Sequence, residues 1–166
     1  NSSIPVMRLS GLPALSQVYF LDLKLKDSAG EVISNNFYWL STRRDVMDYP
    51  ATKWFVTPIK EFADLRALEH LPRVKLEVRH ELERLGSEGK VRVNLQNPTE
   101  SIAFFVEVRL ARKANGDSVL PVYWEDNYVS LLPGESKTIT GIFNLEDLRQ
   151  EEPVIVVNGW NGEGGN

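Results

Sequence analysis

Two pairs of adjacent carboxylates are the residues of this sequence with the most direct route to catalysis. Hydrolysis of a glycosidic bond uses two carboxyl groups about 5–10 Å apart, one of which must act as an acid. Glu125-Asp126 lie in an extended segment, where neighbouring side chains point to opposite faces. Glu151-Glu152 precede Pro153 in a predicted loop. Neither pair matches an acid and a nucleophile, and we predict no catalytic residue in this chain.

Histidine, cysteine and metal chemistry find little support in the residue types. His70 and His80 are the two histidines, and no G-x-S-x-G elbow accompanies them, so we expect ordinary surface or edge residues. The lack of cysteine excludes disulfides, thiol nucleophiles and cysteine-based metal centres. A calcium ion between loops near Asp117 or Asp126 is a minor alternative. We predict no metal and no cofactor.

Aromatic side chains are the remaining candidates for ligand contact. The four tryptophans offer flat apolar faces that could stack on sugar rings, although a tryptophan in a β-sandwich more often packs in the core. Trp124 and Trp160 lie beside polar loop residues, which favours an exposed position. The candidate contacts with carbohydrate or with another domain are Trp124, Asp126, Asn127, Tyr128 and Trp160.

The composition is that of a folded, mildly acidic protein. Among 166 residues, 42% are hydrophobic, which is enough to bury a core, and the net charge is −4. This charge gives no electrostatic reason to expect nucleic acid or an anionic membrane as a partner. No apolar run approaches the roughly 20 residues of a membrane span. Cysteine usage does not set the compartment, and we expect a periplasmic or secreted location rather than a cytoplasmic one.

The candidate residues lie in a β-rich block at residues 73–161, which we predict to be an antiparallel immunoglobulin-like β-sandwich. About seven short strand signals are separated by turn residues, a spacing typical of this architecture. Val91, Val93 and Leu95, for example, alternate with polar residues. Residues 162–166 include three glycines and are expected to form a flexible tail. The predicted core residues are Val93, Phe104 or Phe105, Tyr123, Ile139 and Val156.

Residues 1–72 read as two shorter segments. Residues 1–45 are predicted to be the last strands of a preceding β-sandwich domain, with a hairpin whose first strand alternates from Leu21 and an earlier strand around residues 6–9. Residues 46–72 are predicted to be a connector with one short helix, roughly residues 59–70. Thr57-Pro58 supplies its start signal, and Leu71-Pro72 supplies its stop. The predicted fold class is therefore all-β, with one short connecting helix.

An ordered series of short motifs resembles one protein family. Pro121-Val122-Tyr123-Trp124, Asp126-Asn127-Tyr128 and Leu132-Pro133-Gly134-Glu135 resemble the C-terminal immunoglobulin-like domain of family-2 glycoside hydrolases of the exo-β-D-glucosaminidase, endo-β-mannosidase and β-mannosidase type. Asn97-Pro98 and Gly159-Trp160-Asn161 agree in order. The resemblance implies a parent glycosidase whose catalytic glutamates lie in a barrel, and no segment here matches the motif that carries them.

The sequence leaves three possible functions for this chain. The first is a non-catalytic accessory domain of a glycoside hydrolase that acts on β-linked glucosamine or mannose, with the barrel and the preceding sandwich of the same polypeptide as partners. The alternative is a carbohydrate-binding module that contacts the polysaccharide through exposed aromatic side chains. The third, an enzyme in its own right, is disfavoured because no carboxylate pair fits glycoside hydrolysis.

Overall fold

The computed structural model describes residues 2–6 and 15–165, and the chain divides into two compact units, Asn1–His70 and Leu71–Asn166. The helical segments of the described residues are all short 3-10 turns, and the remaining regular structure is strand. The all-β prediction is therefore confirmed. Within those described residues, no helix is both long and apolar enough to cross a bilayer.

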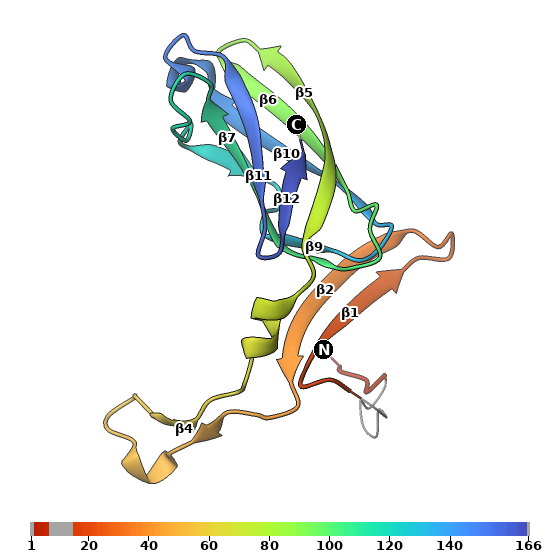
Figure 1. Cartoon of the computed structure of the whole chain (residues 1–166), viewed down its shortest axis with the longest axis vertical. Helices are drawn as coiled ribbons and strands as arrows, with labels where there is room; N and C mark the ends of the chain where they lie inside the picture. Colours follow the sequence, from red (N-terminus) through yellow and green to blue (C-terminus); the bar gives the residue numbers. More distant parts are fainter. Residues whose placement is uncertain (1, 7–14, 166) are drawn as a thin grey trace. The chain divides into compact units, whose positions relative to one another are not determined.

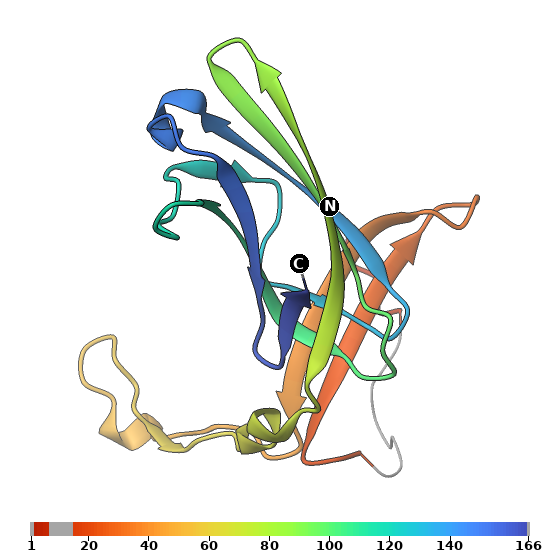
Figure 2. The same cartoon turned by 45° about the horizontal axis from the view of Figure 1, so that its top comes forward.

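The second unit is built from eight strands joined into one sheet that folds over into two layers (Figures 1 and 2). Hydrogen bonding follows the order β8-β10-β6-β5-β12-β11-β7-β9. All neighbouring pairs are antiparallel except β12 and β5, which are parallel. The strands are β5 (Val74–Leu85), β6 (Glu88–Gln96), β7 (Ala103–Arg112), β8 (Val122–Trp124), β9 (Val129–Leu131), β10 (Ser136–Asn144), β11 (Pro153–Asn158) and β12 (Gly162–Gly165).

The core lies between the two layers and follows the alternation of the strands. Val91, Val93 and Leu95 of β6 are completely buried, and Ile139 of β10 faces them from the neighbouring strand, where it pairs with Val93. Phe104 is buried and Phe105 is exposed, which decides between the two phenylalanines of the prediction. Burial of alternate positions stabilises the sandwich, since each fully buried aliphatic side chain contributes about 1.5–3 kcal/mol.

Two predicted core residues lie outside the buried core: Tyr123 is exposed, and Val156 is only partly buried. Tyr123 is exposed because β8 is an edge strand in which Trp124, not Tyr123, faces the interior. Val156 pairs with Arg109 of β7, whereas its neighbours Ile155 and Val157 are buried. A continuous apolar run such as that of β11 does not show which residues face inward, so the register of the neighbouring strand decides it.

Within the predicted tail at residues 162–166, the described residues form a strand. Gly162–Gly165 forms β12, which runs parallel to β5 with Gly162 opposite Val74. A Cβ at Gly164 would lie 2.7 Å from the Val157 side chain, so this glycine permits the strand to pass close to the core. The glycines therefore allow tight packing of β12 rather than a loose end.

The described residues of the first unit form two separate ribbons. β1 (Val18–Lys26) and β2 (Val32–Ser41) form an antiparallel hairpin, as predicted, and the expected earlier strand at residues 6–9 falls mostly outside the described residues. β3 (Val46–Met47) pairs with β4 (Ile59–Glu61), and a 3-10 turn, η1 (Tyr49–Ala51), lies between them.

The connecting helix predicted at residues 59–70 is wrong over its first half. Ile59–Glu61 is strand β4, and only Arg66–His70 is helical, as a 3-10 turn, η2. The Thr57-Pro58 start signal fails because the carbonyl of Pro58 accepts a hydrogen bond from the Asp48 N–H across the ribbon. The backbone of this segment is thus committed to a β-ribbon.

Candidate functional site

Trp124 lies on β8 with its side chain against β10. It pairs with Gly141, and a Cβ built on Gly141 would lie 2.6 Å from the indole ring. The indole therefore covers the bare backbone of the glycine, and it also packs against the buried core cluster. One face of Trp124 is consequently used for packing, which reduces what it can offer to a sugar.

Asn127 follows β8 and binds the backbone of β7. Its Oδ1 accepts a hydrogen bond from the Val108 N–H (2.8 Å), and its Nδ2 donates one to the Val108 carbonyl (2.8 Å). The side-chain amide thus takes the place of a backbone partner at this edge of the strand. Oδ1 also accepts a bond from the Tyr128 N–H (2.9 Å).

Asp126 is held by charge and by its neighbour. One carboxylate oxygen accepts a hydrogen bond from the Asn127 N–H (2.8 Å), and the other forms an ion pair with Lys137 of β10. Both oxygens therefore have partners within the domain. Asp126 and Asn127 together fix the course of the loop between β8 and β9.

Tyr128 and Phe105 form an exposed aromatic pair at the β7–β9 edge. Their ring centroids lie 5.2 Å apart, and both residues have a left-handed backbone, with φ of 54°. Phe105 lies at a β-bulge, where the register of β7 against β9 shifts between Ala103 and Val106. The bulge turns the Phe105 side chain outward beside Tyr128.

A carboxylate completes this outward patch. The Tyr128 hydroxyl donates a hydrogen bond to Oε1 of Glu107 (2.9 Å). This bond, together with the negative charge of Glu107, raises the pKa of the Tyr128 phenol. The patch of Phe105, Glu107 and Tyr128 therefore combines two aromatic faces with one anionic group.

Trp160 lies in the turn between β11 and β12. The backbone N–H of Trp160 donates a hydrogen bond to the Phe104 carbonyl (3.0 Å), while the indole side chain is largely exposed. The neighbouring Asn161 is buried: Nδ2 donates to the carbonyls of Pro72 and Ile102, both at 2.7 Å, and Oδ1 accepts from the Phe104 N–H. Asn161 thus anchors the turn that presents Trp160.

The sequence analysis names Asn161 and Asn97 within motifs but does not predict that both side-chain amides are buried. The Nδ2 of Asn97 donates to the carbonyls of Ser101, Leu131 and Leu132, although the last bond is long at 3.3 Å. Both asparagines stand at the ends of predicted strands, beside a proline or a glycine. Such a position favours an asparagine that bonds the backbone of its own turn, and this signal could have identified them.

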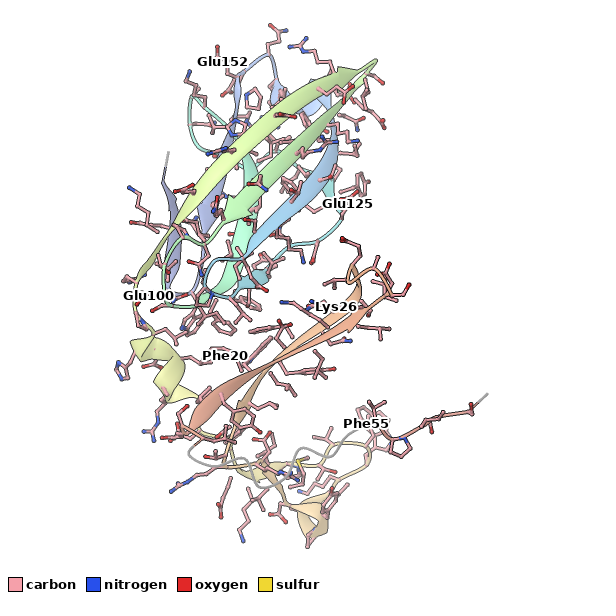
Figure 3. All side chains as sticks on the ribbon, turned by 90° about the vertical axis from the view of Figure 1, so that its right-hand side faces the viewer. Phe20, Lys26, Phe55, Glu100, Glu125 and Glu152 are labelled. Carbon is pink, nitrogen blue, oxygen red and sulfur yellow. The ribbon has the colours of Figure 1, made fainter. Side chains whose placement is uncertain are left out.

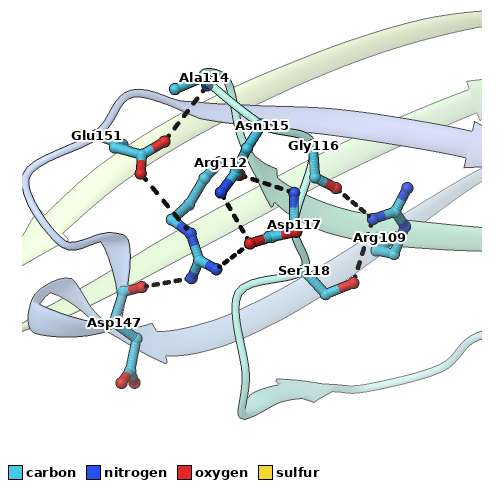
Figure 4. Close-up of polar contacts among 9 residues, drawn as sticks. All are labelled: Arg109, Arg112, Ala114, Asn115, Gly116, Asp117, Ser118, Asp147 and Glu151. Carbon is cyan, nitrogen blue, oxygen red and sulfur yellow. Dashed lines mark hydrogen bonds and ion pairs between the residues drawn. The ribbon is translucent and has the colours of Figure 1, made fainter.

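Asp117 and Glu151 contact a buried arginine, Arg112, near the end of β7 (Figure 4). The guanidinium of Arg112 lies 3.2 Å from Asp117 Oδ2, and its Nε lies 3.9 Å from Glu151 Oε1. One of its terminal nitrogens also donates to the Asp147 carbonyl (3.3 Å). Asp117, considered as a calcium ligand, is therefore occupied by a cation of the protein itself. No group of three or more metal-binding side chains occurs among the residues that the structure describes.

The two carboxylate pairs of the sequence lie apart, as Glu125 and Glu152 show in Figure 3. Glu152 forms an ion pair with Lys113 (2.6 Å), which lowers the pKa of the carboxyl group. The hydrogen bonds from Arg66 likewise lower the pKa of Asp64. The lowered pKa values favour the ionised form of Glu152 and of Asp64, whereas the acid of a glycosidase needs a raised pKa.

The five candidate contacts therefore divide into two kinds. Trp124, Asp126 and Asn127 are engaged in packing and hydrogen bonds within the sandwich. Tyr128 and Trp160 expose large parts of their aromatic rings. The structure brings Tyr128 together with Phe105 and Glu107, neither of which was among the five candidates.

Comparison with known proteins identifies a consistent set of relatives. The family model described as "Exo-beta-D-glucosaminidase Ig-fold domain" matches residues 54–162. The exo-beta-D-glucosaminidase of Arthroderma benhamiae is 48% identical over 94% of this chain, and that of Streptomyces avermitilis is 39% identical over 92%. In both cases the chain spans 17% of the length of the relative.

Solved structures agree with this result. The crystal structure of the exo-chitosanase CsxA of Amycolatopsis orientalis matches 91% of this chain with a TM-score of 0.85 and 34% sequence identity, over 18% of its own length. The complex of a CsxA variant with PNP-beta-D-glucosamine matches 93% with a TM-score of 0.87 and 33% identity. The immunoglobulin-like character of the predicted sandwich is thereby confirmed.

Proposed function

The chain belongs to the family of Ig-fold domains of exo-β-D-glucosaminidases, and from this premise we propose that it is a non-catalytic accessory domain of a glycoside hydrolase. It is one domain of a multi-domain polypeptide, because it spans only about a sixth of the length of its relatives. Its role is to pack against the catalytic part and the preceding sandwich. The parent enzyme acts on β-linked glucosamine rather than mannose, since the relatives carry the glucosaminidase name, and it belongs to glycoside hydrolase family 2.

One observation carries this proposal: the polar candidate residues already form hydrogen bonds and an ion pair within the sandwich. The oxygen and the nitrogen of the Asn127 side-chain amide are both hydrogen-bonded to the backbone of Val108, and Asp126 forms an ion pair with Lys137. A sugar-binding site keeps such groups free to bind hydroxyl groups. Because these groups stabilise the sandwich itself, they support a structural role in which the domain packs against other domains.

Residues 1–45 support the same role, and we propose that they complete a neighbouring sandwich. β1 and β2 form a two-stranded sheet, which is marginally stable alone in water. Leu25, Ile33 and Tyr38 of this hairpin are exposed. Further strands of a preceding domain would pair with the edges of the hairpin and cover these apolar side chains.

Carbohydrate contact is the second candidate function, and the patch of Phe105, Glu107 and Tyr128 favours it. Aromatic faces stack on sugar rings, and a carboxylate attracts the ammonium group of a glucosamine unit. Trp160 offers a further exposed ring in the turn before β12. This candidate predicts weak binding of chitosan oligomers by the isolated domain.

An activity assay and a binding assay test the two candidates together. The purified chain is incubated with chromogenic β-glucosaminide and β-mannoside and titrated with chitosan oligomers. We expect no turnover and no saturable binding. Turnover that is abolished by Glu125→Gln or Asp126→Asn would refute the non-catalytic role. Saturable binding that is lost in Tyr128→Ala, Trp124→Ala or Trp160→Ala would establish the second candidate.

A further inference from the structure

The loop between β3 and β4 ends in an ordered hairpin whose tip is residues 53–56, here called the arm tip (Figure 2). Lys53 and Val56 exchange two backbone hydrogen bonds, of 3.1 and 3.0 Å. The hydroxyl groups of Thr52 and Thr57 are 3.0 Å apart, which closes the base of the tip. The arm tip is thus a hydrogen-bonded turn with a defined shape.

The arm tip displays large apolar side chains to solvent. Trp54 is 89% exposed, Phe55 70% and Val56 57%, and Tyr49 of η1 is 73% exposed. The Trp54 and Phe55 rings contact one another, with centroids 3.7 Å apart, so they form one apolar knob (Phe55 is labelled in Figure 3). Adjacent exposed side chains of this size mark an interaction surface, since monomeric proteins rarely expose large contiguous apolar patches.

The backbone of the turn is strained at Trp54, one of the exposed residues of the arm tip. Trp54 has φ of 54° at the first central position of a two-residue hairpin loop. Glycine usually takes a hairpin position of positive φ, because a side chain there is disfavoured. A large aromatic residue at this position costs stability in the isolated hairpin, and such strain is typical of binding sites.

Charge distinguishes between the possible occupants. Residues 49–60, which Asp48 and Glu61 flank, contain Lys53 and Lys60 and no carboxylate, so the arm tip itself carries only positive charge. A polymer of glucosamine is a polycation, which two lysines repel. A protein surface with an apolar recess and an acidic rim fits the knob and both lysines. The chain spans only 17% of the length of its relatives, so most of the polypeptide lies outside it and is the place to seek such a surface.

We propose that the arm tip docks into an apolar, acidic-rimmed recess on the catalytic part of the same polypeptide. This inference rests on the proposed accessory function. Trp54 and Phe55 fill the recess, and Lys53 faces its rim. The contact holds the unit of residues 1–70 in place.

Trp54→Gly is the sharpest test, because glycine suits the backbone of the turn better than tryptophan does. A variant that merely lost local stability would not be expected from this change. In the full-length polypeptide we expect hydrogen exchange at residues 46–61 to accelerate by about tenfold or more in Trp54→Gly and in Phe55→Ser. Tyr123→Ser, which removes an exposed ring on β8, is the matched control. Equal exchange rates in wild type and Trp54→Gly would overturn the proposal.

A photo-crosslinking residue at position 55 of the full-length polypeptide identifies the occupant directly. We expect crosslinks to a segment outside these 166 residues, and weaker crosslinking in Lys53→Glu because an acidic rim repels it. Crosslinks confined to this domain, or protection of the arm tip by added chitosan oligomers alone, would refute docking on the catalytic part. Hydrolysis by the isolated chain would refute the proposed function without affecting this measurement.

Discussion

The side-chain amide of Asn127 pairs with the backbone of Val108 through two hydrogen bonds, each 2.8 Å long. Val108 is buried on β7, and Asn127 lies in the loop between β8 and β9. The loop is thereby fastened to the central part of the sandwich. A residue that looks like a polar ligand contact in the sequence is in the structure a substitute for a neighbouring strand.

Asn127→Ala should lower the free energy of unfolding by about 1–3 kcal/mol, because the N–H and carbonyl of Val108 both lose their partner in a part-buried place. Urea denaturation followed by fluorescence measures the change. Asn158→Ala, at an exposed asparagine of β11, is the control and should change stability by less than about 0.5 kcal/mol. Equal effects of the two substitutions would contradict the fastening role.

Gly141→Ala tests the packing of Trp124. The added methyl group would meet the indole ring at 2.6 Å, so we expect a loss of about 1–3 kcal/mol through overpacking. Gly162→Ala is the control, since its Cβ would make an ordinary contact at 3.5 Å. Combining Gly141→Ala with Trp124→Leu should cost less than the sum of the single changes, measured as a double-mutant cycle. Strict additivity would show that the two residues do not interact.

Arg112→Ala should destabilise the end of the sandwich where β7 and β11 meet. The guanidinium is largely buried, and Asp117, Glu151 and the Asp147 carbonyl depend on it. We expect a loss of about 1–3 kcal/mol, as for hydrogen bonds to a charged group. Lys113→Ala removes an exposed, solvent-screened ion pair with Glu152 and should cost less stability than Arg112→Ala does. Thermal unfolding of the two variants side by side checks the order.

The ionisation of Tyr128 gives a prediction in the alkaline range. The hydrogen bond to Glu107 raises the pKa of the phenol above its usual value of 10.0. A raised pKa in the folded state means that the contribution of this bond is fully present below pH 10 and is lost as pH rises through the folded pKa. Absorbance titration at alkaline pH should show one late-titrating tyrosine that disappears in Tyr128→Phe and titrates earlier in Glu107→Gln. Unchanged curves in both variants would exclude the interaction.

Much of the fold follows from alternation, because one face of each strand is buried. Val93 and Ile139 are predicted in the core and lie there, since polar neighbours mark their faces. The prediction that Tyr123 and Val156 lie in the core is wrong. In a run of consecutive apolar residues the sequence does not show which side chains face inward, and pairing with the neighbouring strand decides it. The first half of the predicted helix at residues 59–70 fails for a related reason: pairing between β3 and β4 overrides a local start signal, and only Arg66–His70 is helical.

The candidate site is harder to predict than the fold. Tyr128 and Trp160 are exposed as a ligand contact requires. The partners of Tyr128 come from β7, where a bulge that no short-range pattern reveals turns Phe105 outward. The engagement of Asn127 by Val108 depends on a contact between residues 19 positions apart. Distances of this kind arise from the topology of the sheet and not from local spacing.

Removal of residues 1–70 should leave the sandwich intact. Among the residues that the structure describes, the members of the buried core cluster lie between Val74 and Val157, within the second unit. Because the second unit contains this cluster, residues 71–166 should unfold cooperatively with a free energy within about 1 kcal/mol of that of the sandwich in the whole chain. Urea denaturation followed by near-ultraviolet circular dichroism compares the two proteins. A large loss of stability on deletion would show that β1 and β2 belong to the same core, and would contradict their proposed place in a neighbouring domain.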